Sequence, residues 1–507
     1  MSGTLTLLPY DWSEQDVEEK LQMRAWCLDE KSRAVLINIQ NFPVMLTVEL
    51  PMLINGVLCI WSRTKLDLFM STIDEIVSSS GHAPLSSHFQ KKTKLYGFSK
   101  TPVPTLSLHF KSIEAARHVA AILKRPITVS SLGKLQFTTW ETKFSNVRKL
   151  LTCKKLKYSS WFKCTATLVQ DSSAKVPEYT TDFNTLTPHT ATIITNPKIC
   201  AYDIECNSQN VKKFPSALSA PDVCFIITVV YQLYKKPETA RNYAVVWGEC
   251  DKKDVGVEYE IIHAESELEC IRAFEDLIDR LDPDVLTGYN IDGFDVPYLT
   301  QRLVLLGQLR GGSVWRDSGR ITGERSYSSD ADRQMSNGML IEGKILSMAG
   351  RISIDIFKHI RANYSFRIYK LDYVAKQILG EAKGKLDVSP EEIFRAYQTK
   401  DRDLMSEVVS YGMIDAVRTM ELFDKVNLWD TLLAMTAESA IRIVEFYAKG
   451  QSIRCKSQLY DTCFKNDVIC SLTPPAPETE KYAGGYVGDC TPGIHEYVIT
   501  LDFNSLY

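Results

Sequence analysis

The central part of the chain carries short, almost wholly apolar runs separated by stretches with helical spacing. Such runs are typical of strands that are buried within a sheet. Four of them stand out, at residues 199–205, 225–231, 285–290 and 351–357. The first run turns acidic at its C-terminal end, and the third continues into a polar turn. The pattern therefore predicts a sheet with polar side chains at the ends of two strands.

Helices are predicted between and after these strands. Ser266 and Glu269 form a capping box ahead of apolar positions that recur with helical spacing, and the following Asp-Pro pair ends the helix. Residues 404–417 have a second helical pattern. Strands that alternate with helices indicate one α/β domain over residues 196–430.

The segment before this domain has a mixed pattern. Residues 34–39 and 44–50 are predicted strands, and residues 113–123 place their apolar side chains on one helical face. A polar stretch at residues 171–188 indicates a boundary. We therefore expect a mixed α+β N-terminal domain over residues 1–195.

The segment after the α/β domain changes character twice. Residues 431–472 are predicted to be mainly helical, and the proline-rich residues 472–478 form a stiff linker or loop. Residues 497–503 form an apolar run that ends in Asp502, which predicts another strand. Residues 431–507 are thus expected to form a separate region.

One long polar insertion interrupts the α/β pattern. It extends from about residue 311 to 343 and contains glycine, serine and four arginines: Arg316, Arg320, Arg325 and Arg333. A loop of this length is usually functional or disordered. The sequence alone leaves both interpretations open.

Composition narrows the class of protein only modestly. At 507 residues the chain is long enough for two to four domains. Its net charge is −3, so any nucleic-acid binding must come from local basic surfaces. The 13 cysteines include no C-x-x-C pair, which argues against a zinc site and favours a reducing, intracellular location. We expect no signal peptide and no transmembrane segment.

Acidic residues suited to metal binding occur in three separate segments. Asp203 and Glu205 lie two apart in a predicted strand, so they share one face. Asp295 follows the predicted strand and turn at residues 285–290. Tyr411 and Asp415 lie four apart in a predicted helix, about one turn from each other. Any one of these acids alone would be an ordinary cap or surface charge; the set is far more specific.

Grouped carboxylates repel one another and raise one another's pKa unless cations lie between them. Hard oxygen ligands select Mg²⁺ or Mn²⁺. Two such ions about 4 Å apart can activate a water and stabilise a leaving oxygen. The set therefore predicts a two-metal nuclease that trims nucleic acid from an end.

Two basic segments interleaved with aromatic residues are candidate strand-binding surfaces. The first contains Lys91, Lys92, Lys94, Tyr96, Phe98 and Lys100. The second contains Arg148, Lys149, Lys154, Lys155, Lys157, Tyr158, Trp161 and Lys163. A solvated face with ordinary core aromatics explains both segments equally well.

The motifs taken together resemble the N-terminal half of a family B DNA polymerase, of the delta type or from a large eukaryotic DNA virus. Tyr-Asp-Ile-Glu around Asp203, Asn290-x-x-x-Phe294-Asp295 and Tyr411-x-x-x-Asp415 match the three exonuclease motifs of that family. Lys-Leu-Asp-Tyr-Val-Ala from Lys370, Gly-Gln at residues 450–451 and Ser-Gln-Leu at residues 457–459 also match. So do Tyr-Ala-Gly-Gly from Tyr482 and Asp-Phe-Asn-Ser-Leu-Tyr at residues 502–507. The resemblance is clear over residues 195–507 and looser before them.

This resemblance implies a ribonuclease-H-like 3′–5′ exonuclease domain, a preceding N-terminal domain and the start of a polymerase palm. Asp203, Glu205, Asp295 and Asp415 would hold two Mg²⁺ or Mn²⁺ ions, and Tyr411 would orient the attacking water. Asn290 and Phe294 would contact the frayed 3′ end. The insertion stands where the family has a hairpin that helps to part primer from template.

The resemblance also implies roles near the end of the chain. Tyr482, Gly484 and Gly485 would contact DNA between the two active sites. Asp502 would bind metal at the polymerase site, with Ser505, Leu506 and Tyr507 beside the nucleotide. One metal-binding Asp cannot make a two-metal polymerase site, so residues 1–507 alone are not expected to polymerise.

The expected partners are a primer–template, a single-stranded 3′ end, dNTPs in the complete enzyme and a sliding clamp or other processivity factor. The expected location is the nucleus or, for a viral enzyme, the host nucleus or a cytoplasmic replication site. Two other classes of protein remain open. One is a free-standing 3′–5′ exonuclease, and the other is a DNA-binding scaffold subunit with a dead exonuclease site.

Overall fold

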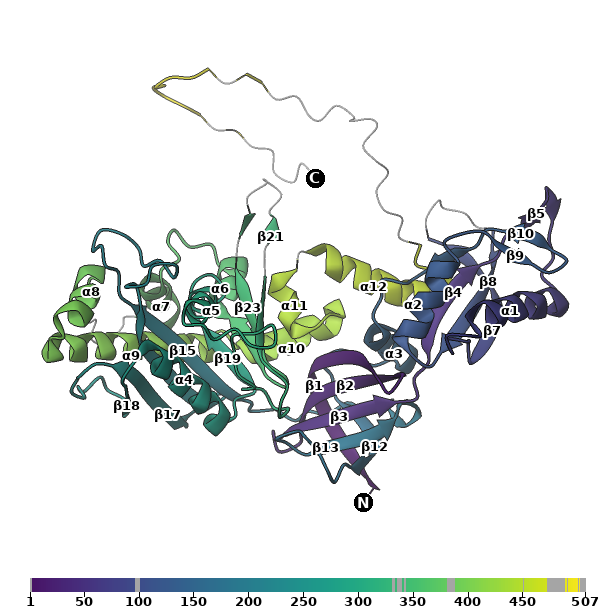
Figure 1. The fold of residues 1–507 in the computed structure, drawn as a ribbon. Coiled ribbons are helices and arrows are strands. Elements are labelled where there is room, and N and C mark those ends of the chain that lie inside the picture. The colour runs from purple at the N-terminus through teal and green to yellow at the C-terminus, as the bar shows by residue number, and fades with distance from the viewer. Residues whose placement is uncertain are drawn as a thin grey trace. The chain divides into compact units, whose positions relative to one another are not determined.

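The computed structural model describes residues 2–95, 101–330, 333–334, 340–341, 343–380, 388–449, 451–471, 488–489, 491–499 and 501. The chain divides into two compact units, Met1–Ser471 and Leu472–Tyr507. All of the helices and strands given below belong to the first unit (Figure 1). Among the described residues, no helix is both long and apolar enough to cross a membrane.

The first sheet of the N-terminal part has the strand order β1-β2-β3-β13-β12-β14, and an additional pairing between β1 and β12 closes it on itself. The strands are β1 (Ser2–Val17), β2 (Lys20–Asp29), β3 (Ala34–Gln40), β12 (Phe162–Leu168), β13 (Glu178–Asp182) and β14 (Thr187–Pro188). A 3-10 turn, η1 (Phe183–Thr185), joins the last two. The prediction of a strand at residues 34–39 is confirmed by β3.

A second sheet of the N-terminal part has the order β11-β4-β8-β7-β25. Its strands are β4 (Val44–Glu49), β7 (Ser86–Lys94), β8 (Val103–Phe110), β11 (Thr138–Trp140) and β25 (Val468–Ile469). Two small strand pairs also belong to this part: β5 (Leu53–Ile54) with β6 (Val57–Leu58), and β9 (Ile127–Val129) with β10 (Gly133–Leu135). The helices of this part are α1 (Arg63–Val77), α2 (Ile113–Ile122) and α3 (Asn146–Lys154). Both the strand at residues 44–50 and the helix at residues 113–123 were predicted correctly.

The α/β part is built on one six-stranded sheet with the order β18-β17-β16-β15-β19-β24. Its strands are β15 (Lys198–Cys206), β16 (Cys224–Leu233), β17 (Lys236–Trp247), β18 (Glu260–Ala264), β19 (Val285–Gly288) and β24 (Ile352–Asp355). The pairs β15–β16 and β16–β17 are antiparallel, and the other three pairs are parallel. The predicted strands at residues 199–205, 225–231 and 285–290 are thus three neighbours in one sheet.

Helices cover both faces of this sheet. Helix α4 (Glu267–Leu281) contacts β16, β17 and β18, whereas α9 (Arg402–Lys425) contacts β15 and β16. Ser266 caps α4 as its sequence predicts, because its side chain accepts from the backbone N–H of Glu269. The other helices of this part are α5 (Asp295–Leu305), α6 (Ile356–Asn363), α7 (Leu371–Leu379) and α8 (Pro390–Thr399).

Three further helices follow α9. They are α10 (Leu428–Ser439), α11 (Ile443–Ala448) and α12 (Gln451–Lys465). The prediction of a helical segment over residues 431–472 is confirmed up to residue 465. It is wrong for residues 468–469, which form β25 and pair with β7, so the chain returns to the N-terminal sheet there.

Two predicted strands differ from the structure. The strand predicted at residues 351–357 ends at Asp355, because that side chain accepts from the backbone N–H of Phe357 and caps α6. The strand predicted at residues 497–503 is not formed at the described residues 497–499 and 501. A strand needs a partner for its backbone groups, and the described residues of the second unit include none.

The second half of the polar insertion forms a β-hairpin with the strand that follows it. Strand β20 (Tyr327–Asp330) pairs antiparallel with β23 (Lys344–Ser347), and β21 (Arg333–Gln334) pairs with β22 (Leu340–Ile341) above it. A hairpin is what the family resemblance implied for this position. The described residues of the insertion thus agree with the hairpin interpretation.

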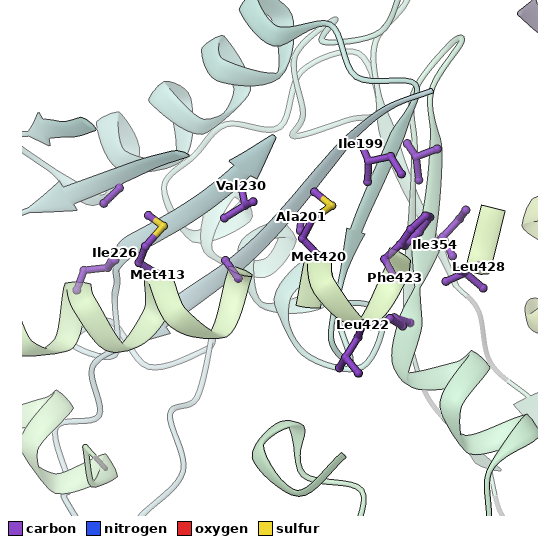
Figure 2. Close-up of a cluster of buried hydrophobic side chains, with 14 of the residues drawn as sticks. Ile199, Ala201, Ile226, Val230, Ile354, Met413, Met420, Leu422, Phe423 and Leu428 are labelled. Carbon is purple, nitrogen blue, oxygen red and sulfur yellow. The ribbon is translucent and has the colours of Figure 1, made fainter. Parts of the chain in front are cut away.

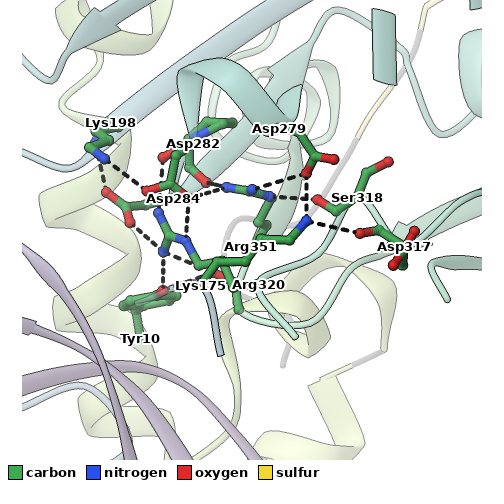
Figure 3. Close-up of polar contacts among 12 residues, drawn as sticks. Tyr10, Lys175, Lys198, Asp279, Asp282, Asp284, Asp317, Ser318, Arg320 and Arg351 are labelled. Carbon is green, nitrogen blue, oxygen red and sulfur yellow. Dashed lines mark hydrogen bonds and ion pairs between the residues drawn. The ribbon is translucent and has the colours of Figure 1, made fainter. Parts of the chain in front are cut away.

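A network of charges joins the segments just before and just after this hairpin (Figure 3). Arg320 precedes the hairpin and Arg351 follows it, and both guanidinium groups donate to Oδ1 of Asp282, at 2.7 Å and 2.8 Å. Arg320 is 0% exposed and also pairs with Asp284 at 2.7 Å. It donates to the Tyr10 hydroxyl of β1 at 2.9 Å, so the network joins the N-terminal sheet to the α/β part.

Candidate active site

The alternation of side chains along β15 explains how the site forms. Ile199 and Ala201 face α9 and belong to the same hydrophobic core as Met413 and Met420 of that helix (Figure 2). Asp203 and Glu205 continue the same row, because every second side chain of a strand points to one face. The apolar start of the row therefore docks the helix, and the acidic end faces the same helix.

Gly412 lets α9 approach the acidic end of this row. A Cβ atom at that position would lie 3.3 Å from Cγ2 of Thr228 and 3.6 Å from Oε1 of Glu205. The hydroxyl of Thr228 on β16 donates to the carbonyl oxygen of Gly412 at 3.0 Å. This close contact places Tyr411 and Asp415, on either side of the glycine, beside the β15 acids.

Asp295 reaches the site from the neighbouring strand. β19 pairs parallel to β15 and ends at Gly288, where a Cβ atom would come within 2.7 Å of the carbonyl oxygen of Tyr202. A tight turn follows, and Asp295 is the first residue of α5. The side chain of Asp295 is 2% exposed, and its Oδ1 has no hydrogen-bond partner in the described part of the chain.

Asp355 holds this turn in place through hydrogen bonds to its backbone. Its carboxylate accepts from the backbone N–H of Asn290 at 2.8 Å and from that of Asp292 at 3.3 Å. Asn290 itself has a positive φ of 66°, a conformation that asparagine adopts more readily than most residues. These contacts give Asp355 a structural role beside the site.

The four acids affect one another's protonation. Burial and the neighbouring carboxylates Asp295, Glu205 and Asp415 raise the pKa of Asp203 well above its ordinary value. Burial followed by Asp415 and Asp295 does the same to the pKa of Glu205. Burial, with a contribution from Asp355, raises the pKa of Asp295. The structure therefore brings Asp203, Glu205, Asp295 and Asp415 into one electrostatic group.

Asp415 has additional partners. Burial and the nearby Asp372 raise its pKa to about 6, while the Tyr411 hydroxyl and Arg418 act in the opposite direction. Arg418 lies one turn further along α9 and contacts Asp415 at 3.4 Å and Asp372 at 2.7 Å. Sequence reasoning missed Arg418, although an arginine three residues after an acid on a helix is a recognisable signal.

The donor set fits divalent cations. Four carboxylates supply only hard oxygen atoms, and the unpartnered Oδ1 of Asp295 is a buried acceptor that a cation would satisfy. Within the described ranges, no three His, Cys, Asp or Glu side chains are close enough to form a metal centre as they stand.

Phe294 lies in an aromatic row beside the acids. Its ring centroid is 5.2 Å from that of Tyr298 and 5.1 Å from that of Phe214. Phe214 belongs to the loop between β15 and β16 and is 76% exposed. The sequence analysis missed Phe214, although a Phe-Pro pair in a polar loop soon after the first acids is an available signal.

Several predicted residues lie outside the described residues. They are Tyr482, Gly484, Gly485, Asp502, Ser505, Leu506 and Tyr507, together with Tyr96, Phe98 and Lys100 of the first basic segment. The described part of that segment, Lys91 to Lys94, lies on β7, where Lys94 pairs with Glu49 at 2.9 Å.

Two of the charged residues in the second basic segment are buried. Arg148 and Lys149 are 4% and 5% exposed. Lys149 donates from Nζ to the carbonyl oxygen of Met45 at 2.6 Å, and Arg148 donates to that of Ala440 at 3.1 Å and pairs with Asp461. These two charges hold α3 against neighbouring elements, so the strand-binding interpretation is wrong for them.

Two family models match the chain. The model described as DNA polymerase family B, exonuclease domain, matches residues 137–374, and the model described as DNA polymerase family B matches residues 441–507. Together they cover more than half of the chain. The chain belongs to the family B DNA polymerases.

The exonuclease match includes Asp203, Glu205 and Asp295 but ends before Tyr411 and Asp415. The packing of α9 brings these last two residues to the same place.

Curated relatives are viral and delta-type polymerases. The chain is 28% identical over 544 residues to DNA polymerase 120R of Invertebrate iridescent virus 3, covering 98% of this chain and 45% of the relative. It is 26% identical over 510 residues to the DNA polymerase delta catalytic subunit of Plasmodium falciparum (isolate K1 / Thailand), covering 96% and 44%. The chain therefore spans less than half the length of these relatives.

A solved structure supports the fold. The family B DNA polymerase from the hyperthermophilic archaeon Pyrobaculum calidifontis matches with a TM-score of 0.65 at 18% identity, over 94% of this chain and 52% of that one. At this identity the likeness shows the fold alone. The expected architecture, an α/β exonuclease domain preceded by a mixed N-terminal domain, agrees with it.

Proposed function

We propose that this chain is part of a DNA-directed DNA polymerase, and that its α/β part is the 3′–5′ proofreading exonuclease. The observation that carries the proposal is the single row of side chains on β15, in which Asp203 and Glu205 face Tyr411 and Asp415 of α9. The family match and the delta-type and viral relatives support it. The domain limits of 1–195, 196–430 and 431–507 are part of the proposal.

Asp203, Glu205, Asp295 and Asp415 are the residues that would hold two Mg²⁺ or Mn²⁺ ions. Family B polymerase and exonuclease domains are generally dependent on divalent metals. Bound cations would supply Lewis acidity and lower the pKa of a water molecule. The donor set and the raised pKa values of these carboxylates support this assignment.

The chain's own residues would position the reactants. The Tyr411 hydroxyl, which acts to lower the pKa of Asp415, would hold the attacking water. The exposed ring of Phe214 and the ring of Phe294 offer a surface for the last base, and Asn290 lies at the turn beside them. A frayed 3′ nucleotide held there would have its phosphodiester over the four acids.

The polymerase half of the proposal rests on the family. Asp502 would bind metal at the polymerase site, Ser505, Leu506 and Tyr507 would contact the incoming dNTP, and Tyr482, Gly484 and Gly485 would contact DNA. Partners would be a primer–template and a sliding clamp or other processivity factor. A replication enzyme of this kind would work in the nucleus or, if viral, at a host replication site.

The test is a gel time course with a 5′-labelled single-stranded oligonucleotide and Mg²⁺. A ladder that shortens from the 3′ end, lost in Asp203→Ala, is the expected result. Tyr411→Phe should slow digestion about tenfold, because it removes one hydrogen bond near a charged group. Undiminished digestion by Asp203→Ala would refute the site.

The outcomes also separate the alternative functions. If the chain digests DNA, but adding further polypeptide does not enable it to extend a primer, a free-standing exonuclease is favoured. Tight primer–template binding without digestion by folded protein would favour a nuclease-dead scaffold. Both alternatives share the fold, so only activity distinguishes them.

A further inference from the structure

A loop beside the site combines aromatic rings with unpaired positive charge. It comprises residues 364–370, between α6 and α7, and is called the aromatic loop below. Tyr364, Phe366 and Tyr369 are half-buried, and Arg367 is exposed. The rings of Tyr364 and Phe366 stack with an interplanar angle of 16° and a centroid distance of 5.5 Å. The sequence analysis named only the last residue of this loop, Lys370.

The aromatic loop is held in one conformation by its own hydrogen bonds. The Tyr369 hydroxyl donates to the carbonyl oxygen of Tyr364 at 2.8 Å and accepts from the backbone N–H of Phe366 at 3.2 Å. Phe366 is also 6.2 Å from Tyr373 of α7, ring to ring. A surface fixed in this way loses little entropy when a ligand binds.

The aromatic loop is connected to the site at both of its ends. The hydroxyl of Tyr289, which precedes Asn290, donates to the carbonyl oxygen of Tyr369 at 2.6 Å. Just after the loop, Asp372 pairs with Arg418, and Arg418 contacts Asp415. The loop therefore borders both the turn that carries Asn290 and the helix that carries Tyr411 and Asp415.

The charge of the aromatic loop is not neutralised by its neighbours. In the part of the chain that the structure describes, Arg367 has no hydrogen-bond or ion-pair partner. Arg361, one turn before the loop on α6, is exposed and lies over the Phe357 ring at 5.9 Å. Exposed guanidinium groups next to partly exposed aromatic rings suit a ligand that has both phosphates and bases.

We propose that the aromatic loop is a platform for the single-stranded DNA that leads into the exonuclease site. Phe366 presents a ring face to a base upstream of the cleaved nucleotide, and Arg367 and Arg361 contact phosphates. This inference rests on the proposed function. Stacking combined with backbone charge is the usual way that proteins bind single strands without regard to sequence.

The packing alternative for Phe366 is that its ring only completes the core under the loop. That role would make Phe366 important for stability but would give no reason for the unpaired Arg367 beside it. The two roles differ in a measurable way, because packing affects the melting temperature whereas a platform affects affinity for bases.

The test compares Phe366→Leu and Arg367→Gln with the wild type and with Arg125→Ala, an exposed arginine of the N-terminal part. Binding is measured in EDTA with labelled oligo-dT and with an abasic oligonucleotide of equal length. Phe366→Leu should weaken oligo-dT binding about fivefold or more, without affecting the abasic probe. Arg367→Gln should weaken both probes and reduce the salt slope of log K by about 0.7.

Digestion in Mg²⁺ supplies the second readout. Both variants should raise KM while kcat at saturating oligonucleotide stays within about twofold, because neither side chain belongs to the acidic site. Unchanged KM, affinity and salt slope in Arg367→Gln would overturn the platform. Because Arg367 is exposed, its substitution should not disturb folding. The Arg367→Gln variant therefore tests the platform even if Phe366→Leu folds poorly.

The two proposals can fail separately. If the wild type digests DNA but neither variant differs from it, the platform is wrong and the exonuclease assignment stands. If the wild type binds but does not digest, and the variants still lose affinity as described, the platform stands and the exonuclease proposal falls.

Discussion

At the scale of single residues, the site is a group of charges that the fold holds close together against their repulsion. Asp203, Glu205 and Asp295 all have raised pKa values, chiefly because they are buried. Natural proteins accept such local instability where function requires it. The residues that matter for activity should therefore be unfavourable for the stability of the metal-free protein.

Asp203→Asn tests this trade-off. The amide keeps the shape of the carboxylate but removes one charge from the group, so the melting temperature in EDTA should rise by about 2 °C or more. Digestion should be lost in Mg²⁺. The matched control is Asp171→Asn, at an exposed acid, which should change neither property. A lower melting temperature for Asp203→Asn would contradict the repulsion.

A buried histidine should make stability depend on pH. Burial lowers the pKa of His359 to about 4, whereas an unfolded histidine titrates near its ordinary pKa of about 6.5. The unfolded state therefore binds more protons between these values, and stability should fall as the pH drops from about 6.5 to about 4. Above about pH 6.5 the ring is neutral in both the folded and the unfolded state, so His359 no longer lowers the stability.

The measurement is urea unfolding across this pH range. His359→Gln should show a weaker loss of stability with falling pH than the wild type, whereas His88→Gln, at an exposed histidine on β7, should follow the wild type. Parallel pH profiles for wild type and His359→Gln would show that the buried ring does not titrate as described.

At the scale of elements, the structure depends on how closely α9 lies against β15 and β16. The sequence predicted both elements correctly, because each has a strong apolar period. It could not predict their contact, since the position of Gly412 against Thr228 depends on packing across residues far apart in sequence. Asp203 and Glu205 could be placed on one face from alternation alone. Arg418 and Phe214 also have sequence signals, but those signals do not say which side chains the two residues contact.

Gly412 substitutions test that contact. Alanine should be tolerated with digestion reduced less than about fivefold, because its Cβ meets Thr228 Cγ2 at 3.3 Å and helix propensity improves. Leucine should push α9 away from the strand and reduce digestion at least about a hundredfold, since small misplacements of catalytic groups are costly. Circular dichroism should show the helices retained in both variants. Full digestion by Gly412→Leu would contradict the close approach.

At the scale of the whole first unit, the N-terminal and α/β parts share their largest core. That core includes Tyr10 and Trp26 from the N-terminal sheet together with Ile199 and Val285 from the α/β sheet. Gly350 has a φ of 75°, and a Cβ there would meet the Trp26 ring at 2.7 Å. The sequence predicted a polar boundary at residues 171–188 but could not show that the two parts pack across it.

Arg320→Met tests the charge network that joins the two parts. Asp282 keeps its pairs with Arg351 and Lys198, but the buried Asp284 loses the guanidinium group of Arg320. The free energy of unfolding should therefore fall by about 3–5 kcal/mol. Arg316→Met is the matched control, because Arg316 is 47% exposed and its pair with Asp276 should contribute at most about 1 kcal/mol. Equal losses in urea unfolding would show that burial of the network is unimportant.

The order of the acids along the chain has a consequence for biosynthesis. Asp203 and Asp415 come from β15 and α9, and the contacts between these elements span a long stretch of sequence. Contacts of that kind form late in folding, because a long loop must close first. A polypeptide still emerging from the ribosome would carry the first acids without the helix that completes them. Under the proposed function, hydrolysis of nucleic acid would therefore begin only after α9 has been synthesised and docked.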